Sequence, residues 1–85
     1  MKIQAEVSLY PLRAKEIAKI INTFCQSLAQ ANLKVESGPM STHISGDVGI
    51  IFESLENAFI YSAEECEVVM TVKMSNACPE EVESK

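Results

Sequence analysis

The chain has 85 residues, of which 47% are hydrophobic, and a formal net charge of −5. This length suffices for one domain, and the scattered lysines and single arginine form no basic patch of the kind that nucleic acids or anionic membranes require. No apolar run approaches the roughly 20 residues of a transmembrane helix, and residues 1–10 do not form a signal peptide. We therefore expect one cytoplasmic domain that binds neither nucleic acid nor membranes.

The reactive side chains indicate binding rather than catalysis. The three cysteines, Cys25, Cys66 and Cys78, contain no CxxC pair, and their odd number is typical of reduced thiols in the cytoplasm. The only histidine, His43, has no second metal ligand at a suitable spacing. We find no Ser–His–Asp arrangement, glycine-rich phosphate loop or pair of carboxylates in a clear cleft. The sequence thus predicts neither enzymatic activity, nor a cofactor, nor a metal.

The first half of the chain predicts a strand and a helix. Residues 2–10 alternate with period two, which predicts a strand that ends at Pro11. Residues 13–32 have the periodicity of an amphipathic helix. The residues expected to face the core from these two elements are Ile3, Ala5, Val7 and Leu9, followed by Ile17, Ile20, Ile21, Phe24, Leu28 and Ala31.

The second half predicts three strands and one helix. Short strands at 33–37 and 40–45 are joined by the turn Gly38-Pro39, and Asp47 is a natural N-cap for a helix that extends to about residue 63. A last strand is predicted at 67–74. The expected core residues are Met40, Thr42 and Ile44, then Val48, Ile51, Phe52, Leu55 and Phe59, and finally Val68, Met70, Val72 and Met74.

The order strand, helix, strand, strand, helix, strand predicts an α+β ferredoxin-like sandwich. Right-handed crossovers give a four-stranded antiparallel sheet with both helices on one face and the strands in the order fourth, first, third, second. The single domain is expected to span residues 1–75. Residues 76–85 are expected to form a mobile acidic tail, because they contain too little apolar surface to pack.

The hydroxyl-rich segment after Gly38-Pro39 has two interpretations. The hydroxyls of Ser41 and Thr42 could hydrogen-bond an aminopyrimidine edge, because a hydroxyl both donates and accepts, or they could satisfy the backbone of the turn. His43 could bind a ligand ring or lie at an interface. Tyr10 could stack on a heteroaromatic ring or pack at a subunit contact.

Four segments together resemble the small YkoF-like thiamine-binding proteins. They are the strand 5–12, the element Gly38-Pro39-Met40-Ser41-Thr42, the helix start at 44–47 and the closing strand 69–74. The resemblance covers nearly the whole chain except the tail. It implies a ferredoxin-like subunit that assembles as a homo-oligomer, either a dimer or a tetramer. It also implies non-catalytic binding of thiamine or its hydroxymethylpyrimidine moiety.

The resemblance places the ligand at the turn and at the end of the first strand. The predicted ligand-binding residues are Ser8, Tyr10, Gly38, Pro39, Met40, Ser41, Thr42 and His43. The alternative is a structural or regulatory oligomerisation module, in which the open face of the sheet binds a second copy of the chain or a protein partner.

Overall fold

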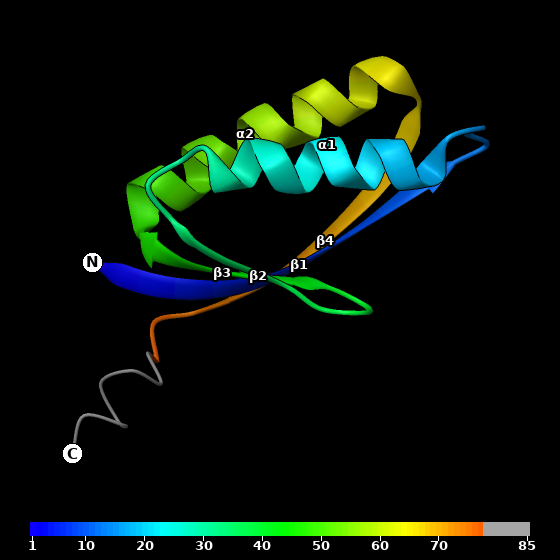
Figure 1. The fold of residues 1–85 in the computed structure, drawn as a ribbon. Helices are drawn as coiled ribbons and strands as arrows, with labels where there is room; N and C mark the ends of the chain where they lie inside the picture. The colour runs from blue at the N-terminus through cyan, green and yellow to red at the C-terminus, as the bar shows by residue number, and fades with distance from the viewer. Residues whose placement is uncertain (78–85) are drawn as a thin grey trace.

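Two helices cover one face of a four-stranded antiparallel sheet in the computed structural model, which describes residues 1–77 (Figure 1). The strands are β1 (Lys2–Leu12), β2 (Lys34–Ser37), β3 (Thr42–Asp47) and β4 (Glu67–Ser75), in the order β2-β3-β1-β4. The helices are α1 (Ile17–Ala29) and α2 (Val48–Glu65). The predicted ferredoxin-like fold and strand order are confirmed. Cys78 and the rest of the predicted tail, residues 78–85, lie outside the described residues.

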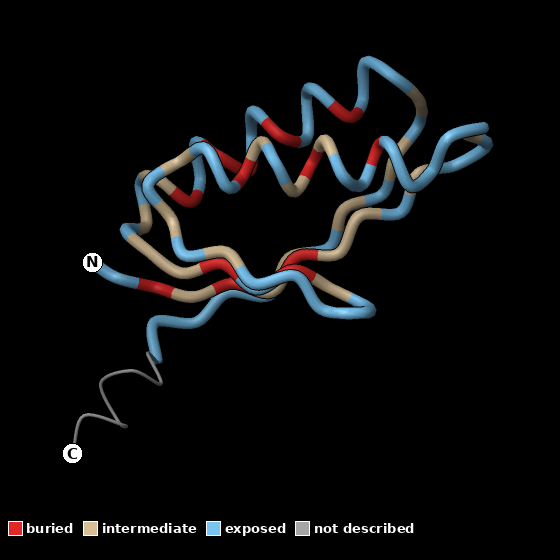
Figure 2. The backbone as a smooth tube through the Cα atoms, viewed as in Figure 1, coloured by how far each residue is buried: buried red, intermediate tan, exposed pale blue. Residues whose placement is uncertain are grey.

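The hydrophobic core lies between the helices and the sheet, where Figure 2 shows the buried segments on the facing sides of both layers. β1 contributes the alternating residues Ile3, Ala5 and Val7, which are all buried. Leu28 of α1 and Ile51 of α2 are completely inaccessible to solvent. The period of two in β1 therefore predicts its buried face correctly. Within residues 1–77, no helix is long and apolar enough to cross a membrane.

The connection between β1 and α1 differs from the prediction. β1 continues through Pro11, which pairs with Val68 of β4. Proline is tolerated there because β3 pairs with β1 only as far as Val7, so the missing N–H faces no neighbouring strand. Arg13 then takes a positive φ of 54°, and this conformation redirects the chain and delays the start of α1 to Ile17. The helix also ends earlier than predicted, at Ala29.

The buried face of α2 is also displaced from the prediction. Phe52 and Phe59 are 56% and 38% exposed. Besides Ile51 and Leu55, the buried residues of α2 are Ser54, Ala58 and Ser62. Small residues spaced four apart let α2 approach α1 closely. The buried hydroxyl of Ser62 donates to the carbonyl of Ala58 at 2.9 Å, so this donor is satisfied.

Four other residues expected in the core are exposed to solvent to differing extents. Met40 is 85% exposed because β3 begins only at Thr42, which leaves Met40 in the loop of the β2–β3 hairpin. Met74 is 39% exposed near the end of the edge strand β4. Ile17 is 47% exposed as the first residue of α1, and Ile21 is 37% exposed because it borders a cavity.

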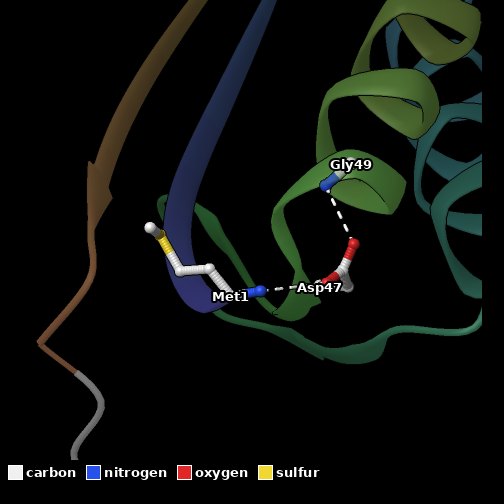
Figure 3. Close-up of polar contacts among 3 residues, drawn as sticks. All are labelled: Met1, Asp47 and Gly49. Carbon is white, nitrogen blue, oxygen red and sulfur yellow. Dashed lines mark hydrogen bonds and ion pairs between the residues drawn. The ribbon is translucent and has the colours of Figure 1, made fainter.

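Asp47 forms the predicted N-cap of α2. Its Oδ2 accepts the N–H of Gly49 at 3.1 Å, and the amino group of Met1 lies 3.3 Å from Oδ1 (Figure 3). The hydrogen bond from Gly49, assisted by the Met1 amino group, lowers the pKa of the Asp47 carboxyl. Just before the cap, Gly46 has φ +158°, and a Cβ there would lie 2.6 Å from Leu33 Cδ2. A larger residue at this position would therefore be strained.

Candidate functional site

A cavity of about 230 Å³ lies between α1 and the β2–β3 hairpin, whose loop extends beyond the sheet beneath α1 in Figure 1. Three parts of the chain line it. They are Val7, Ser8 and Leu9 of β1, Ile21, Asn22, Phe24 and Cys25 of α1, and Ser37, Gly38, Met40, Ser41 and Thr42 of the hairpin.

Polar contacts of one thiol connect the hairpin to α1. The Sγ atom of Cys25 lies 3.5 Å from Oγ1 of Thr42, and the Ser37 hydroxyl donates to the same sulfur at 3.9 Å. Cys25 is half-buried and Thr42 is buried. Because sulfur is a weak hydrogen-bonding partner, these contacts can be exchanged for contacts to a ligand at little cost.

The loop of the hairpin is held by three further hydrogen bonds. The N–H of Gly38 donates to the carbonyl of Ser41 at 2.8 Å, and the hydroxyl of Ser8 donates to the carbonyl of Met40 at 3.4 Å. The Ser41 hydroxyl donates to Oε2 of Glu6 at 2.9 Å. A Cβ on Gly38 would lie 3.1 Å from the Ser41 carbonyl oxygen, so glycine suits the closed loop. The Glu6 carboxylate is thus placed one hydroxyl away from the cavity.

Five of the eight predicted ligand-binding residues line this cavity, and three do not. Those in the lining are Ser8, Gly38, Met40, Ser41 and Thr42. Of the remaining residues, Pro39 is exposed in the loop, Tyr10 lies beside Val69 on the sheet, and His43 lies on β3 between Glu6 and Glu36 of the neighbouring strands. A role for any of the eight in ligand binding stays a prediction.

The contribution of α1 was not predicted from the sequence. Asn22 and Cys25 lie three residues apart, so they share one side of the helix, and both line the cavity. Helical periodicity gives that shared side. It does not give which side of α1 meets the hairpin, because this depends on how the helix packs across the sheet.

The lining is electrically neutral and combines apolar walls with hydroxyl groups. It contains no lysine, arginine, histidine, aspartate or glutamate. Within residues 1–77, no group of three potential ligands could hold a metal ion. Such a lining suits a small neutral molecule that combines an apolar surface with hydrogen-bonding groups.

A sequence model of the YKOF-related family matches residues 2–81. No curated protein matches the chain significantly. Solved structures, including the following three, share its fold over nearly the full length of both chains. Protein MJ1052 from Methanocaldococcus jannascii is 24% identical with a TM-score of 0.83, and the match covers 98% of this chain and 94% of the other.

Protein SP2199 from Streptococcus pneumoniae is 19% identical, with a TM-score of 0.85 and coverage of 98% of this chain and 99% of the other. A "putative thiamine biosynthesis/salvage protein" (TM0486) from Thermotoga maritima is 15% identical, with a TM-score of 0.83 and coverage of 99% and 98%. At these identities the structural likeness establishes the fold, whereas the family match concerns the sequence itself.

Proposed function

The chain belongs to the YkoF-related family, and on this premise we propose that it binds thiamine or its hydroxymethylpyrimidine moiety without transforming it. The proposed site is the cavity between α1 and the β2–β3 hairpin. The observation that carries the proposal is the neutral, hydroxyl-rich lining that includes Ser8, Ser41 and Thr42. The structural likeness to the T. maritima protein, described as a putative thiamine biosynthesis/salvage protein, supports a link to thiamine.

The size of the cavity favours the pyrimidine part of the ligand. Its volume of about 230 Å³ is below the roughly 300–1,000 Å³ of pockets that enclose drug-sized molecules. A single ring therefore fits inside, and the thiazolium ring of thiamine would extend outward. The Glu6 carboxylate, held by Ser41 at 2.9 Å, is close enough to attract that positive charge.

In this proposal the protein is non-catalytic and homo-oligomeric, lies in the cytoplasm and needs no cofactor. The cavity lining offers no histidine, amine or carboxylate as a general base. Cys25 and Cys66 are both free thiols, which is compatible with the proposed reducing compartment. Assembly into a dimer or tetramer would bury more surface than a domain of this size buries alone.

Isothermal titration of the full chain with thiamine, and separately with hydroxymethylpyrimidine, tests this function. We expect saturable binding at micromolar affinity to both, because the ring that enters the cavity is common to them. Thr42→Val and Ser41→Ala each remove one lining hydroxyl and should weaken binding about tenfold, the effect of one lost hydrogen bond of about 1.4 kcal/mol. Ser45→Ala removes a hydroxyl from the same strand outside the cavity and should leave affinity unchanged.

Flat traces for both ligands would overturn the proposal. So would equal losses of affinity in Thr42→Val and Ser45→Ala, because the binding would then not depend on the cavity. Melting temperatures measured with and without ligand provide a second readout, since a ligand that binds only the folded state stabilises it.

The alternative function, a structural or regulatory oligomerisation module, is favoured by one observation. Neither helix covers the second face of the sheet (Figure 1), and Tyr10 and Val69 lie side by side on that face, 50% and 46% exposed. A pure oligomerisation module would self-associate through this face and bind neither thiamine nor hydroxymethylpyrimidine. The titrations above therefore separate the two functions.

A further inference from the structure

A second cavity, which we call the helix groove, lies between the two helices and carries charged side chains of both signs. Its volume is about 240 Å³. Each helix contributes three residues to its lining: Lys19, Ile20 and Thr23 of α1, and Tyr61, Ser62 and Glu65 of α2. None of these residues lines the cavity at the β2–β3 hairpin. The helix groove is therefore a separate candidate site.

The two charges of the helix groove come from different helices. Because α1 and α2 run antiparallel, the beginning of α1 lies beside the end of α2 (Figure 1). Lys19 is in the first turn of α1, and Glu65 is the last residue of α2. Within residues 1–77, no ion pair joins the two, and Lys19 instead has a solvent-exposed contact of 3.8 Å with Glu16. Such an exposed pair contributes little, so both charges are available to a ligand.

Each of these charges has the sign that its end of the helix disfavours. The N-terminal end of a helix is partially positive and favours acids, whereas the C-terminal end is partially negative and favours bases. α1 has no acidic residue in its first turn, and α2 has no basic residue in its last turn. Lys19 therefore adds to the positive potential of α1, and Glu65 adds to the negative potential of α2. Local conflicts of this kind are expected at functional sites.

Two hydroxyl groups of the helix groove act as hydrogen-bond acceptors for a ligand. The Thr23 hydroxyl donates to the carbonyl of Lys19 at 2.9 Å, and the Ser62 hydroxyl donates to the carbonyl of Ala58 at 2.9 Å. Each oxygen keeps lone pairs that can accept. Ser62 is only 4% exposed and lies three residues before Glu65, so the two share one side of α2. This side of the groove suits a group that only donates, such as an ammonium.

We propose that the helix groove binds a small zwitterion, namely an α-amino acid with an apolar side chain. The ammonium group of the ligand contacts Ser62 and Glu65, and its carboxylate contacts Lys19. Its side chain packs against the buried Ile20 and the ring of Tyr61, which is 56% exposed without a ligand. The volume of about 240 Å³ is below the roughly 300–1,000 Å³ of pockets for drug-sized molecules, so a free amino acid fits better than a larger molecule.

Titration of the isotope-labelled full chain with L-leucine, followed by NMR of the backbone amides, tests this site. We expect saturable shifts centred on Ile20, Thr23 and Ser62, with a dissociation constant on the order of 1 mM, because an open groove buries only part of so small a ligand. Isopentylamine keeps the side chain but lacks the carboxylate, and isocaproate lacks the ammonium. Each should bind at least about tenfold more weakly than L-leucine, because one charge-assisted contact is lost.

Variants assign each charge to one end of the ligand. Lys19→Gln and Glu65→Gln should each weaken L-leucine binding about tenfold. Lys19→Gln should leave isopentylamine binding unchanged, since this probe has no carboxylate, and Glu65→Gln should likewise leave isocaproate binding unchanged. Lys15→Gln and Glu64→Gln neutralise exposed residues outside the lining and are the matched controls, with unchanged affinity for L-leucine. The amide spectra also check that every variant is folded.

Three results would overturn the proposal: no localised shifts up to the solubility limit of L-leucine, equal binding of L-leucine and either analogue, or equal losses of affinity in the variants and their controls. Isopentylamine that binds as well as L-leucine would indicate a site for simple cations instead. Because neither thiamine nor hydroxymethylpyrimidine is present, the outcome is independent of the titrations that test the cavity at the hairpin. Failure of one proposal therefore leaves the other standing.

Discussion

The two faces of the sheet are made from the same strands but differ in what their side chains contact. On the helix-covered face, Ile3, Ala5 and Val7 pack in the core. On the opposite face, which no helix covers and which we call the bare face, Glu6 contacts a serine hydroxyl and has His43 and Lys73 as its register neighbours. Because alternate residues of one strand point to opposite faces, neighbouring positions can differ completely in function. In this domain we expect stability to depend mainly on the helix-covered face.

The cavity lies at the boundary between these two environments. Thr42 is buried against α1, whereas the next residue towards the loop, Ser41, contacts Glu6. The hairpin loop therefore takes part in both environments, with apolar packing on one side and charge nearby on the other. This combination suits a ligand that has a neutral ring and a cationic ring.

Adjacent residues of β3 provide the largest contrast between the faces. Ile44→Ala should lower the free energy of unfolding by about 2–5 kcal/mol, because Ile44 is fully buried and its loss leaves a cavity. Ser45→Ala should change it by about 0.5 kcal/mol or less, since no core contact is lost. Urea unfolding at low protein concentration, where self-association is negligible, measures both. Similar losses in both variants would contradict the division between the faces.

The outer surface of α2 gives a smaller contrast within the helical layer. Phe52→Ala should cost about 1 kcal/mol or less, because more than half of the side chain is already exposed. The same truncation of a core phenylalanine costs about 3–5 kcal/mol. The adjacent Ile51, which is completely buried, provides the matched control, and Ile51→Ala should be the more damaging change. A larger loss in Phe52→Ala would show that the helix presents Phe52 to the core after all.

Sequence periodicity predicts β1 and the strand order well but the helix faces less well. A strand has only two faces, so the alternation of Ile3, Ala5 and Val7 leaves no ambiguity. A helix has a continuous surface, and α2 carries apolar residues on several sides, including Phe52, Phe59 and Ile60. The side of α2 that packs in the interior carries the small residues Ser54, Ala58 and Ser62. Hydrophobicity alone does not predict that this side is the buried one.

The same reasoning explains which parts of the candidate site could be predicted. Gly38, Ser41 and Thr42 are close in sequence, so their proximity follows from the turn. Cys25 and Asn22 reach the cavity from a separate element, and their participation depends on the placement of α1 over the sheet. Tyr10 was predicted as a neighbour because it lies near Ser8, yet it points to the bare face with Val69.

The junction between β3 and α2 gives the smallest expected effect, at a residue that belongs to both layers. The Gly49 N–H and the Met1 amino group lower the pKa of Asp47 in the folded protein below its ordinary value of about 3.9. The charged form therefore favours folding above that value, and its contribution disappears as the pH falls through the lower, folded pKa.

Asp47→Asn keeps a capping oxygen but removes the charge. We expect this variant to be slightly less stable than wild type at pH values near neutral and equal to it in strong acid, when urea unfolding is compared at both. A difference that persists in acid would show that Asp47 acts through cap geometry rather than through its charge.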